Sequence, residues 1–153
     1  MINSVVVFTL DEQRYGIPLH VVERVVRAVE VTPLRQAPAN VLGFIDIQGN
    51  IVPVLSLRRL LRLVDREIGP EDEFILVKTV RRRLALVVDI VSGVMECAEQ
   101  DLTVAKQILP GLDFLRGVIR TEDGMILIVN LDEFLSLPEE RLLEEEIPAS
   151  TWP

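Results

Sequence analysis

The sequence predicts a mainly β protein made of two similar halves. Short apolar runs rich in β-branched residues alternate with turn residues along most of the chain, which is typical of strands joined by hairpins. The pattern of the first half returns in the second half at a nearly constant offset. Hydrophobic residues make up 49% of the 153 positions, which is enough for a packed interior. Many short strands with turns between them favour two small barrels or one sandwich.

The first half opens with a predicted hairpin. Val5–Leu10 is an apolar run, the four residues Asp11–Arg14 form a polar connection, and Tyr15–Val22 is the returning segment. Val22–Val31 is rich in β-branched residues but interrupted by charges. It fits a strand or a poor helix, and we favour the strand.

The stretch Gly43–Leu61 predicts strand, turn, strand and short helix. Gly49 and Asn50 both tolerate a positive φ and mark the turn. The following apolar run is too short for a buried helix, and Pro53 within it favours an edge strand or a bulge, because proline donates no hydrogen bond. Ser56 is an N-cap candidate. The helical face after it would hold Leu57, Leu60, Leu61 and Val64.

The second half repeats this plan. Phe74–Thr79 and Leu84–Val91 match the first hairpin at an offset of 69 residues, and Gly117–Leu135 matches Gly43–Leu61 at an offset of 74. Matching turn positions and helix starts favour a duplication, with motif halves over about 1–66 and 72–137. The tip between the second pair of strands, Arg81–Arg83, is expected to be solvated.

The C-terminal part is predicted to form short helices. Asn130 and Glu133 have the spacing of a capping box, and Pro138 can open a final helix that Leu142 and Leu143 dock. We expect a single domain over residues 1–147 and a flexible tail over 148–153. Removal of Ile147–Pro153 is expected to change thermal stability little.

Charge and composition exclude several classes of protein. The net charge is −8, and seven acidic residues against one basic residue lie between Asp132 and Glu146. A nucleic-acid partner is therefore not expected, since binding to the phosphate backbone needs a basic face. No apolar run is long enough to span a bilayer, and no signal peptide opens the chain, so direct membrane insertion is not expected and a cytoplasmic location is. The single Cys97 excludes an internal disulfide.

The residues that usually carry chemistry are isolated. His20 is the single histidine, Cys97 has no CxxC partner, and Asp89 is a lone carboxylate near the end of an apolar strand, expected to face outward. The glycines form no phosphate-binding loop. We therefore expect no enzyme activity, no catalytic or metal-binding residue and no cofactor. The alternative is a small ligand or metal sensor, or an enzyme, that uses a groove between the lobes with Asp89 or His20.

An ordered set of motifs resembles the CheW-like family of bacterial chemotaxis coupling proteins. The matches are Val7–Leu10 with Tyr15–Pro18, Val21–Val25, Gly43–Ile45 through Gly49–Val54 to Leu57-Arg58, Leu86–Asp89, and Phe114–Val118. Each motif alone is weak, whereas their order over about 130 residues is specific.

The resemblance implies a fold and a function. The fold is two five-stranded SH3-like β-barrel lobes related by internal pseudo-symmetry, with a short helix after each lobe motif and a C-terminal helix. The function is a non-catalytic adaptor that couples a chemoreceptor cytoplasmic tip to the regulatory domain of a histidine kinase, in the cytoplasm or recruited to membrane receptor arrays. The receptor would dock between the lobes. The residues expected to bind partners are Val22, Arg24, Val25, Gln48, Arg58, Leu84 and Val88.

The chain departs from the family pattern at three places. Gln48 stands where the family usually has arginine, Arg24 where it has an acid, with Glu23 displaced by one position, and Ser56 where it has aspartate. These changes alter the charges that would meet a partner and suggest a divergent or accessory copy, for example in a pathway controlling pilus motility or development. Arg58 follows the core-facing Leu57 and is expected to be exposed.

Overall fold

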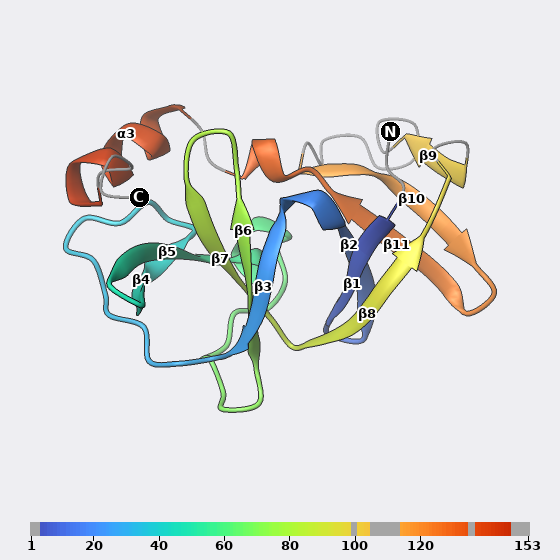
Figure 1. Ribbon diagram of the computed structural model, residues 1–153, viewed down its shortest axis with the longest axis horizontal. Coiled ribbons are helices and arrows are strands. Elements are labelled where there is room, and N and C mark those ends of the chain that lie inside the picture. Colours follow the sequence, from blue (N-terminus) through green and yellow to red (C-terminus); the bar gives the residue numbers. More distant parts are fainter. Residues whose placement is uncertain (1–3, 99–100, 105–113, 135–136, 148–153) are drawn as a thin grey trace.

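The computed structural model describes residues 4–98, 101–104, 114–134 and 137–147, and the fold is mainly β (Figure 1). No helix in these ranges is long and apolar enough to cross a membrane. The strands of the described chain are β1 (Ser4–Leu10), β2 (Gln13–Pro18), β3 (Val22–Arg27), β4 (Val41–Ile47), β5 (Asn50–Ser56), β6 (Glu73–Lys78), β7 (Arg83–Val88), β8 (Ile90–Glu96), β9 (Leu102–Val104), β10 (Leu115–Thr121) and β11 (Gly124–Val129). The helices are η1 (Leu19–Val21), α1 (Leu57–Leu60), η3 (Leu131–Glu133) and α3 (Leu137–Glu146).

The strands form two sheets, each belonging to one lobe. Lobe A has the strand order β8-β1-β2-β11-β10-β9, and lobe B has the order β3-β6-β7-β5-β4. The predicted two-lobed β architecture is confirmed. Lobe A contains six described strands where five were expected, because the three-residue β9 adds to the outer side of β10. Closure of each sheet into a barrel stays a prediction.

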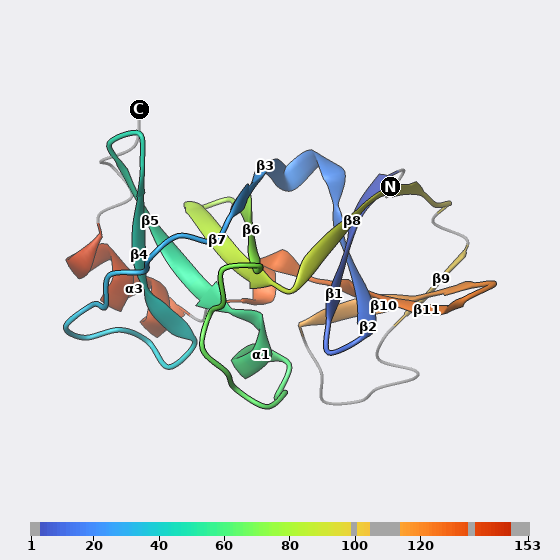
Figure 2. The same cartoon turned by 90° about the horizontal axis from the view of Figure 1, so that it is seen from below.

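The two sequence repeats exchange strands between the lobes. Lobe A takes the hairpin β1–β2 from the first repeat and β8–β11 from the second, whereas lobe B takes β3–β5 from the first repeat and β6–β7 from the second. Figure 2 shows the result: the chain enters lobe A, crosses to lobe B before β3 and returns to lobe A at β8. Matching strands in the two lobes therefore occupy matching places in the two sheets.

The registers of the two sheets agree residue by residue with the predicted offsets. Val5 pairs with Pro18 in lobe A, and the residues 69 positions later, Phe74 and Val87, pair in lobe B. The parallel pairs match as well: Ile128 lies opposite Gly16, and their equivalents Val54 and Ala85 lie opposite each other. The internal duplication is thus confirmed at the level of strand pairing.

The core follows the same duplication. A small cluster within lobe A contains Val5, Val7, Ile119, Ile126 and Ile128. The equivalent positions in lobe B belong to a second cluster of Phe74, Leu76, Ile45, Val52 and Val54 together with Ala85. The largest cluster lies between the lobes and joins buried residues of both sheets, such as Phe8 and Ile17 with Ile75 and Leu86. Burial between the lobes is thus the largest single source of hydrophobic stabilisation.

Two predicted turns lie closer to the N-terminus than expected. Asp11 and Glu12 have φ values of 48° and 69°, so the first hairpin has a two-residue turn and β2 already begins at Gln13. In the next hairpin, Gln48 (φ 53°) and Gly49 (φ 87°) form the turn, and Asn50 starts β5. The carboxylate of Asp46 accepts a 2.7 Å hydrogen bond from the backbone N–H of Gly49, which fixes the turn one residue early.

Pro53 lies in an interior strand, although an edge position or a bulge was expected. β5 lies between β4 and β7, and Pro53 pairs in register with Phe44 on β4. The parallel pairing of β5 with β7 begins only at Val54. Proline is tolerated because the ladder with β7 starts one residue after it.

The short helices partly match the predictions. Ser56 caps α1, because its Oγ accepts from the backbone N–H of Arg59 at 3.2 Å. Val64 is 82% exposed, since α1 ends at Leu60 and the predicted apolar face stops there. Asn130 precedes η3 without a capping bond from its side chain, so the predicted capping box is wrong.

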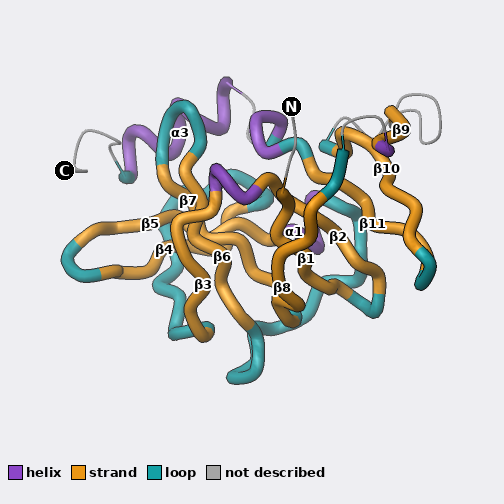
Figure 3. The backbone as a smooth tube through the Cα atoms, turned by 45° about the vertical axis from the view of Figure 1, so that its right-hand side comes forward, coloured by secondary structure: helices purple, strands orange, loops and turns teal. Residues whose placement is uncertain are grey.

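The C-terminal helix α3 packs onto the body of the protein (Figure 3). Leu143 is fully buried in the core between the lobes, as predicted, while Leu142 is half-buried. Ile147, the last residue of the expected domain, is 3% exposed and therefore packed. The expected small effect of removing Ile147–Pro153 on thermal stability stays a prediction. The predicted tail over 148–153 lies outside the described residues.

Candidate functional site

An apolar surface lies where the two lobes meet. The strands β3 and β8 are equivalent in the two repeats, and each is the outer strand of its sheet (Figures 1 and 2). Val22 and Val25 on β3 are half-buried, while Ile90 and Val94 on β8 are 55% and 59% exposed. Leu19, in the link between β2 and β3, is 40% exposed. Ile90 lies opposite Thr9 and Val94 lies opposite Val6, so the side chains of Ile90 and Val94 are on opposite faces of the sheet. We call the side chains of Leu19, Val22, Val25 and Val94 the junction surface. Its exposed apolar area marks a candidate interaction site.

The backbone of both strands adds to this surface. β3 pairs with β6 and β8 pairs with β1, and each strand has no second strand beside it among the described residues. Outer strands present backbone N–H and C=O groups that a partner can use.

Four of the seven expected partner-binding residues are at least partly exposed: Val22, Arg24, Val25 and Gln48. Val22, Arg24 and Val25 share β3, and the side chain of Arg24 is exposed. Gln48 is exposed as well, but it lies in the β4–β5 turn at the outer end of lobe B, away from β3 and β8 (Figure 1). Val22 and Val25 therefore join the junction surface, and Gln48 does not.

Leu84 and Val88 are core residues. Both lie on β7, which has a neighbouring strand on each side, and they are 1% and 0% exposed. Both side chains belong to the cluster between the lobes. Their expected role as surface contacts is therefore wrong, because a continuous apolar strand in the middle of a sheet is buried on both faces.

Arg58 is buried, although it was expected to be exposed. It is 7% exposed, and its Nη1 lies 2.7 Å from Oδ1 of Asp11. Its Nη2 lies 2.8 Å and 3.0 Å from Oδ1 and Oδ2 of Asp89. Asp11 is in the β1–β2 turn of lobe A, and Asp89 is in the link from β7 to β8. The arginine thus connects lobe B to lobe A rather than facing solvent.

A second arginine extends these ion pairs. Arg66, in the loop after α1, donates to both carboxylate oxygens of Asp72 at 2.8 Å and 2.9 Å and to Oδ1 of Asp89 at 2.7 Å. Asp89 therefore accepts from Arg58, from Arg66 and from the backbone N–H of Asp11. The five side chains Arg58, Arg66, Asp11, Asp72 and Asp89 are called the junction network below.

The titration of the carboxylates reflects these contacts. Burial opposes ionisation of Asp89, but the hydrogen bonds from Arg58 and from the Asp11 backbone outweigh it, so the pKa of Asp89 lies below its ordinary value. Burial also opposes ionisation of Asp72. The hydrogen bonds from Arg66 and from the Gly69 backbone outweigh it, so the pKa of Asp72 is lowered as well. Asp89 is therefore a structural carboxylate, and its oxygens are engaged by cations and an N–H group.

Arg82 is another buried cation that the sequence did not reveal. It was expected to lie in a solvated tip, yet its side chain is 1% exposed. Its guanidinium donates to Glu140 at 3.1 Å, to Glu144 at 3.0 Å and to the carbonyl of Ile147 at 3.0 Å. These contacts fasten α3 to the β6–β7 turn of lobe B, and Arg82 neutralises part of the acidic C-terminal end of the helix.

One feature of the sequence indicated that Asp89 could belong to a buried ion pair. A carboxylate at the end of an apolar strand, such as Asp89, needs a partner if it is buried. The partner could not be identified, because Arg58 lies 31 positions from Asp89 and 47 from Asp11.

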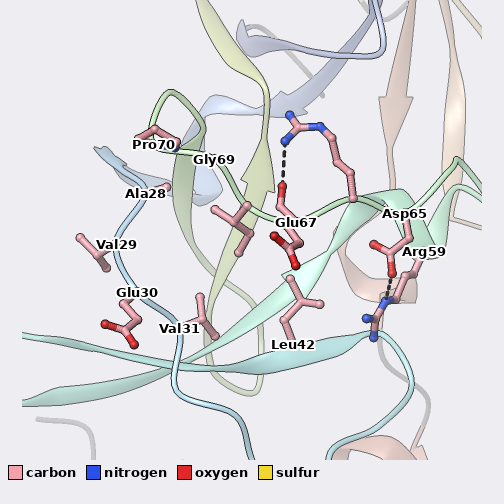
Figure 4. Close-up of a pocket in the computed structure, with 12 residues that line it drawn as sticks. Ala28, Val29, Glu30, Val31, Leu42, Arg59, Asp65, Glu67, Gly69 and Pro70 are labelled. Carbon is pink, nitrogen blue, oxygen red and sulfur yellow. Dashed lines mark hydrogen bonds and ion pairs between the residues drawn. The ribbon is translucent and has the colours of Figure 1, made fainter.

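A separate open pocket of about 910 Å³ lies on lobe B (Figure 4). Val29, Val31 and Leu42 supply apolar lining, and Glu30 and Glu67 lie on its rim. Arg59 and Asp65, also on the rim, pair with each other at 3.0 Å. The lining does not include any of the seven expected partner-binding residues.

Comparison with known proteins gives consistent matches over the chain. The family model for the CheW-like domain matches residues 4–139. "Chemotaxis protein CheW" of Treponema pallidum is 24% identical over 142 residues, which cover 89% of this chain and 84% of that protein. "Protein FrzA" of Myxococcus xanthus is 30% identical over 95 residues, covering 62% of this chain and 59% of that protein.

A solved structure matches the fold as well as the sequence. The scaffolding protein TtCheW from Thermoanaerobacter tengcongensis superposes with a TM-score of 0.81 at 27% sequence identity. The superposition covers 91% of this chain and 96% of that one. Both lobes and their mutual arrangement are therefore shared with that scaffold.

Proposed function

This chain belongs to the CheW-like domain family, and from that premise we propose that it is a non-catalytic scaffold that couples chemoreceptors to a histidine kinase in bacterial chemosensory signalling. The observation that carries the proposal is the match of the whole two-lobed fold to a scaffolding protein of this family. The junction surface adds a place for a polypeptide partner, since it combines exposed apolar side chains with two outer strands.

We further propose that the junction surface binds the helical cytoplasmic tip of the receptor. An amphipathic helix presents apolar side chains every three to four residues, which suits an apolar surface formed by Val22 and Val25 of β3 and Val94 of β8. The regulatory domain of the kinase would contact strand ends of one lobe, and the protein would work in the cytoplasm at receptor arrays. Catalysis has no place in this proposal, because Asp89 is held by two arginines.

Capture of a receptor-tip fragment tests the proposal. Val94→Asp places a charge on the junction surface and is expected to weaken binding about tenfold or more. Val80→Asp is the matched control, because Val80 is 92% exposed in the β6–β7 turn, away from β8. It is expected to change binding less than about twofold. Binding of the kinase regulatory domain is measured in parallel. Equal loss in both variants, or no binding by the unmodified chain, would contradict the proposal.

A further inference from the structure

The junction network joins parts of the protein that belong to different lobes. Arg58 is on α1, which follows strand β5 of lobe B, and its two acidic partners lie in the first turn of lobe A and in the link between the lobes. The guanidinium also donates to the carbonyl of Val64 at 3.3 Å. Both terminal nitrogens of Arg58 are thus engaged within the chain, and the residue is only 7% exposed.

The network ends at the start of β8, the strand that carries Val94 of the junction surface. The backbone N–H of Asp89 donates to the carbonyl of Thr9 on β1 at 3.0 Å, and the next residue, Ile90, begins β8. One step further, the N–H of Val91 donates to the carboxylate of Glu73 on β6 of lobe B at 2.8 Å. The start of β8 is thus fixed to both lobes through side chains and backbone together.

The duplicated fold does not itself require these ion pairs. The positions equivalent to Arg58 and Asp11 in the other repeat are Asp132 and Val80, and both are exposed. The β6–β7 turn of lobe B is held in a different way, by Arg82 and the acidic side chains of α3. The junction network is therefore a feature of one side of the molecule.

We propose that Arg58 is a positioning residue whose ion pairs with Asp11 and Asp89 set the orientation of lobe A relative to lobe B and thereby the shape of the junction surface. The second part of this inference rests on the proposed function, whereas the first part concerns the chain alone. Partner binding would then respond to Arg58 although the partner never touches it.

Residual dipolar couplings of the isotope-labelled full chain test the orientation. The first variant is Arg58→Met, which removes the charge and keeps the apolar part of the side chain. The second is Asp11→Asn, which is expected to fold normally because Asp11 is a half-exposed turn residue. Asp65→Asn is the matched control, since Asp65 pairs with the neighbouring Arg59 entirely on the lobe B side. In the unmodified chain and the control, one alignment tensor is expected to fit the N–H couplings of both sheets. In Arg58→Met and Asp11→Asn, each sheet is expected to keep its own structure but to need a separate tensor.

Affinity for a receptor-tip fragment is measured on the same samples. We expect a loss of about tenfold for Arg58→Met, a smaller loss for Asp11→Asn and less than about twofold for Asp65→Asn. A single tensor that still fits both sheets in Arg58→Met and in Asp11→Asn would overturn the positioning role. Separate tensors with unchanged affinity would overturn the link to partner binding. If the unmodified chain binds no receptor fragment, the proposed function fails, while the tensors still decide the role of Arg58.

Discussion

At the scale of single residues, the duplicated fold shows how volume is shared between matched positions. Gly16 lies opposite Ile128 in lobe A, and the equivalent pair in lobe B is Ala85 opposite Val54. In lobe B the extra carbon is the methyl group of Ala85 on β7. In lobe A the strand equivalent to β7 has Gly16, and the extra carbon is on the facing Ile128 of β11. A Cβ atom built on Gly16 would lie 2.8 Å from Cδ1 of Ile128, closer than packed carbon atoms allow.

Gly16→Ala is expected to destabilise the protein by about 1–2 kcal/mol, because a buried methyl group is added to a filled core. Adding Ile128→Val removes the carbon in conflict, makes the pair resemble that of lobe B, and is expected to recover about half of the loss. Chemical denaturation measures both variants. Gly69→Ala serves as the control, since a Cβ there meets its nearest atom only at 3.9 Å. Additive losses in the double variant would contradict this account.

Residue-scale chemistry was the part least accessible from the sequence. Arg58, Leu84 and Val88 were expected at a surface, and all three are buried. For the two apolar residues, the missing information was that β7 has a neighbour on each side. For Arg58 it was the position of two carboxylates far away in the chain, which only the folded structure brings together.

At the scale of elements, α3 depends on one arginine from the β6–β7 turn. The helix ends with three consecutive glutamates, which is unfavourable at the negative end of a helix dipole. Arg82 offsets this by bonding to Glu140, Glu144 and the carbonyl of Ile147 from a buried position.

Arg82→Met is expected to lower the free energy of unfolding by about 2–4 kcal/mol, because it removes the cation from a buried ion-paired site and leaves acidic groups without it. Arg81→Met, at the exposed neighbouring position, is expected to cost less than about 0.5 kcal/mol. Hydrogen exchange gives a second readout, since the amides of α3 should lose protection before those of β6 and β7. Equal protection of α3 in both variants would show that Leu143 and Ile147 alone hold the helix.

Strands were predicted from the sequence better than helices were. Apolar runs placed the starts of most strands to within one or two residues, because burial on a sheet requires those residues wherever the strand pairs. The ends of β2, β3 and β7 lie three or four residues before the predicted ends. Turns shifted by one or two residues, as at Gln48, where the Asp46 side chain decided the position. The capping box at Asn130 failed, since η3 is too short to need it.

At the scale of the whole molecule, the exchange of strands between repeats determines what can fold alone. Each repeat lacks strands that complete the sheets in which it takes part, because β1–β2 pair with β8 and β11, and β6–β7 pair with β3 and β5. The repeat was visible in the sequence, but the exchange was not, since it depends on the parallel pairing of Val54 with Ala85 and of Ile128 with Gly16.

A chain divided between residues 70 and 71 is expected to give two fragments that are each unfolded and that regain the native spectrum when mixed in equal amounts. Circular dichroism and two-dimensional NMR spectra of the separate and mixed fragments measure this. A fragment over 22–88, which contains every strand of lobe B, is the comparison. Native-like spectra from either half on its own would contradict the exchange.

The order in which strands leave the ribosome follows from the same topology. Lobe B is continuous in the chain from β3 to β7, whereas the first hairpin of lobe A gains its neighbours only when β8 and β11 have been synthesised. During translation, about a hundred residues therefore separate an early apolar hairpin from the strands that cover it. Nascent chains of this topology carry a β1–β2 segment without its neighbouring strands for most of their synthesis, and we expect chaperones to bind that hairpin.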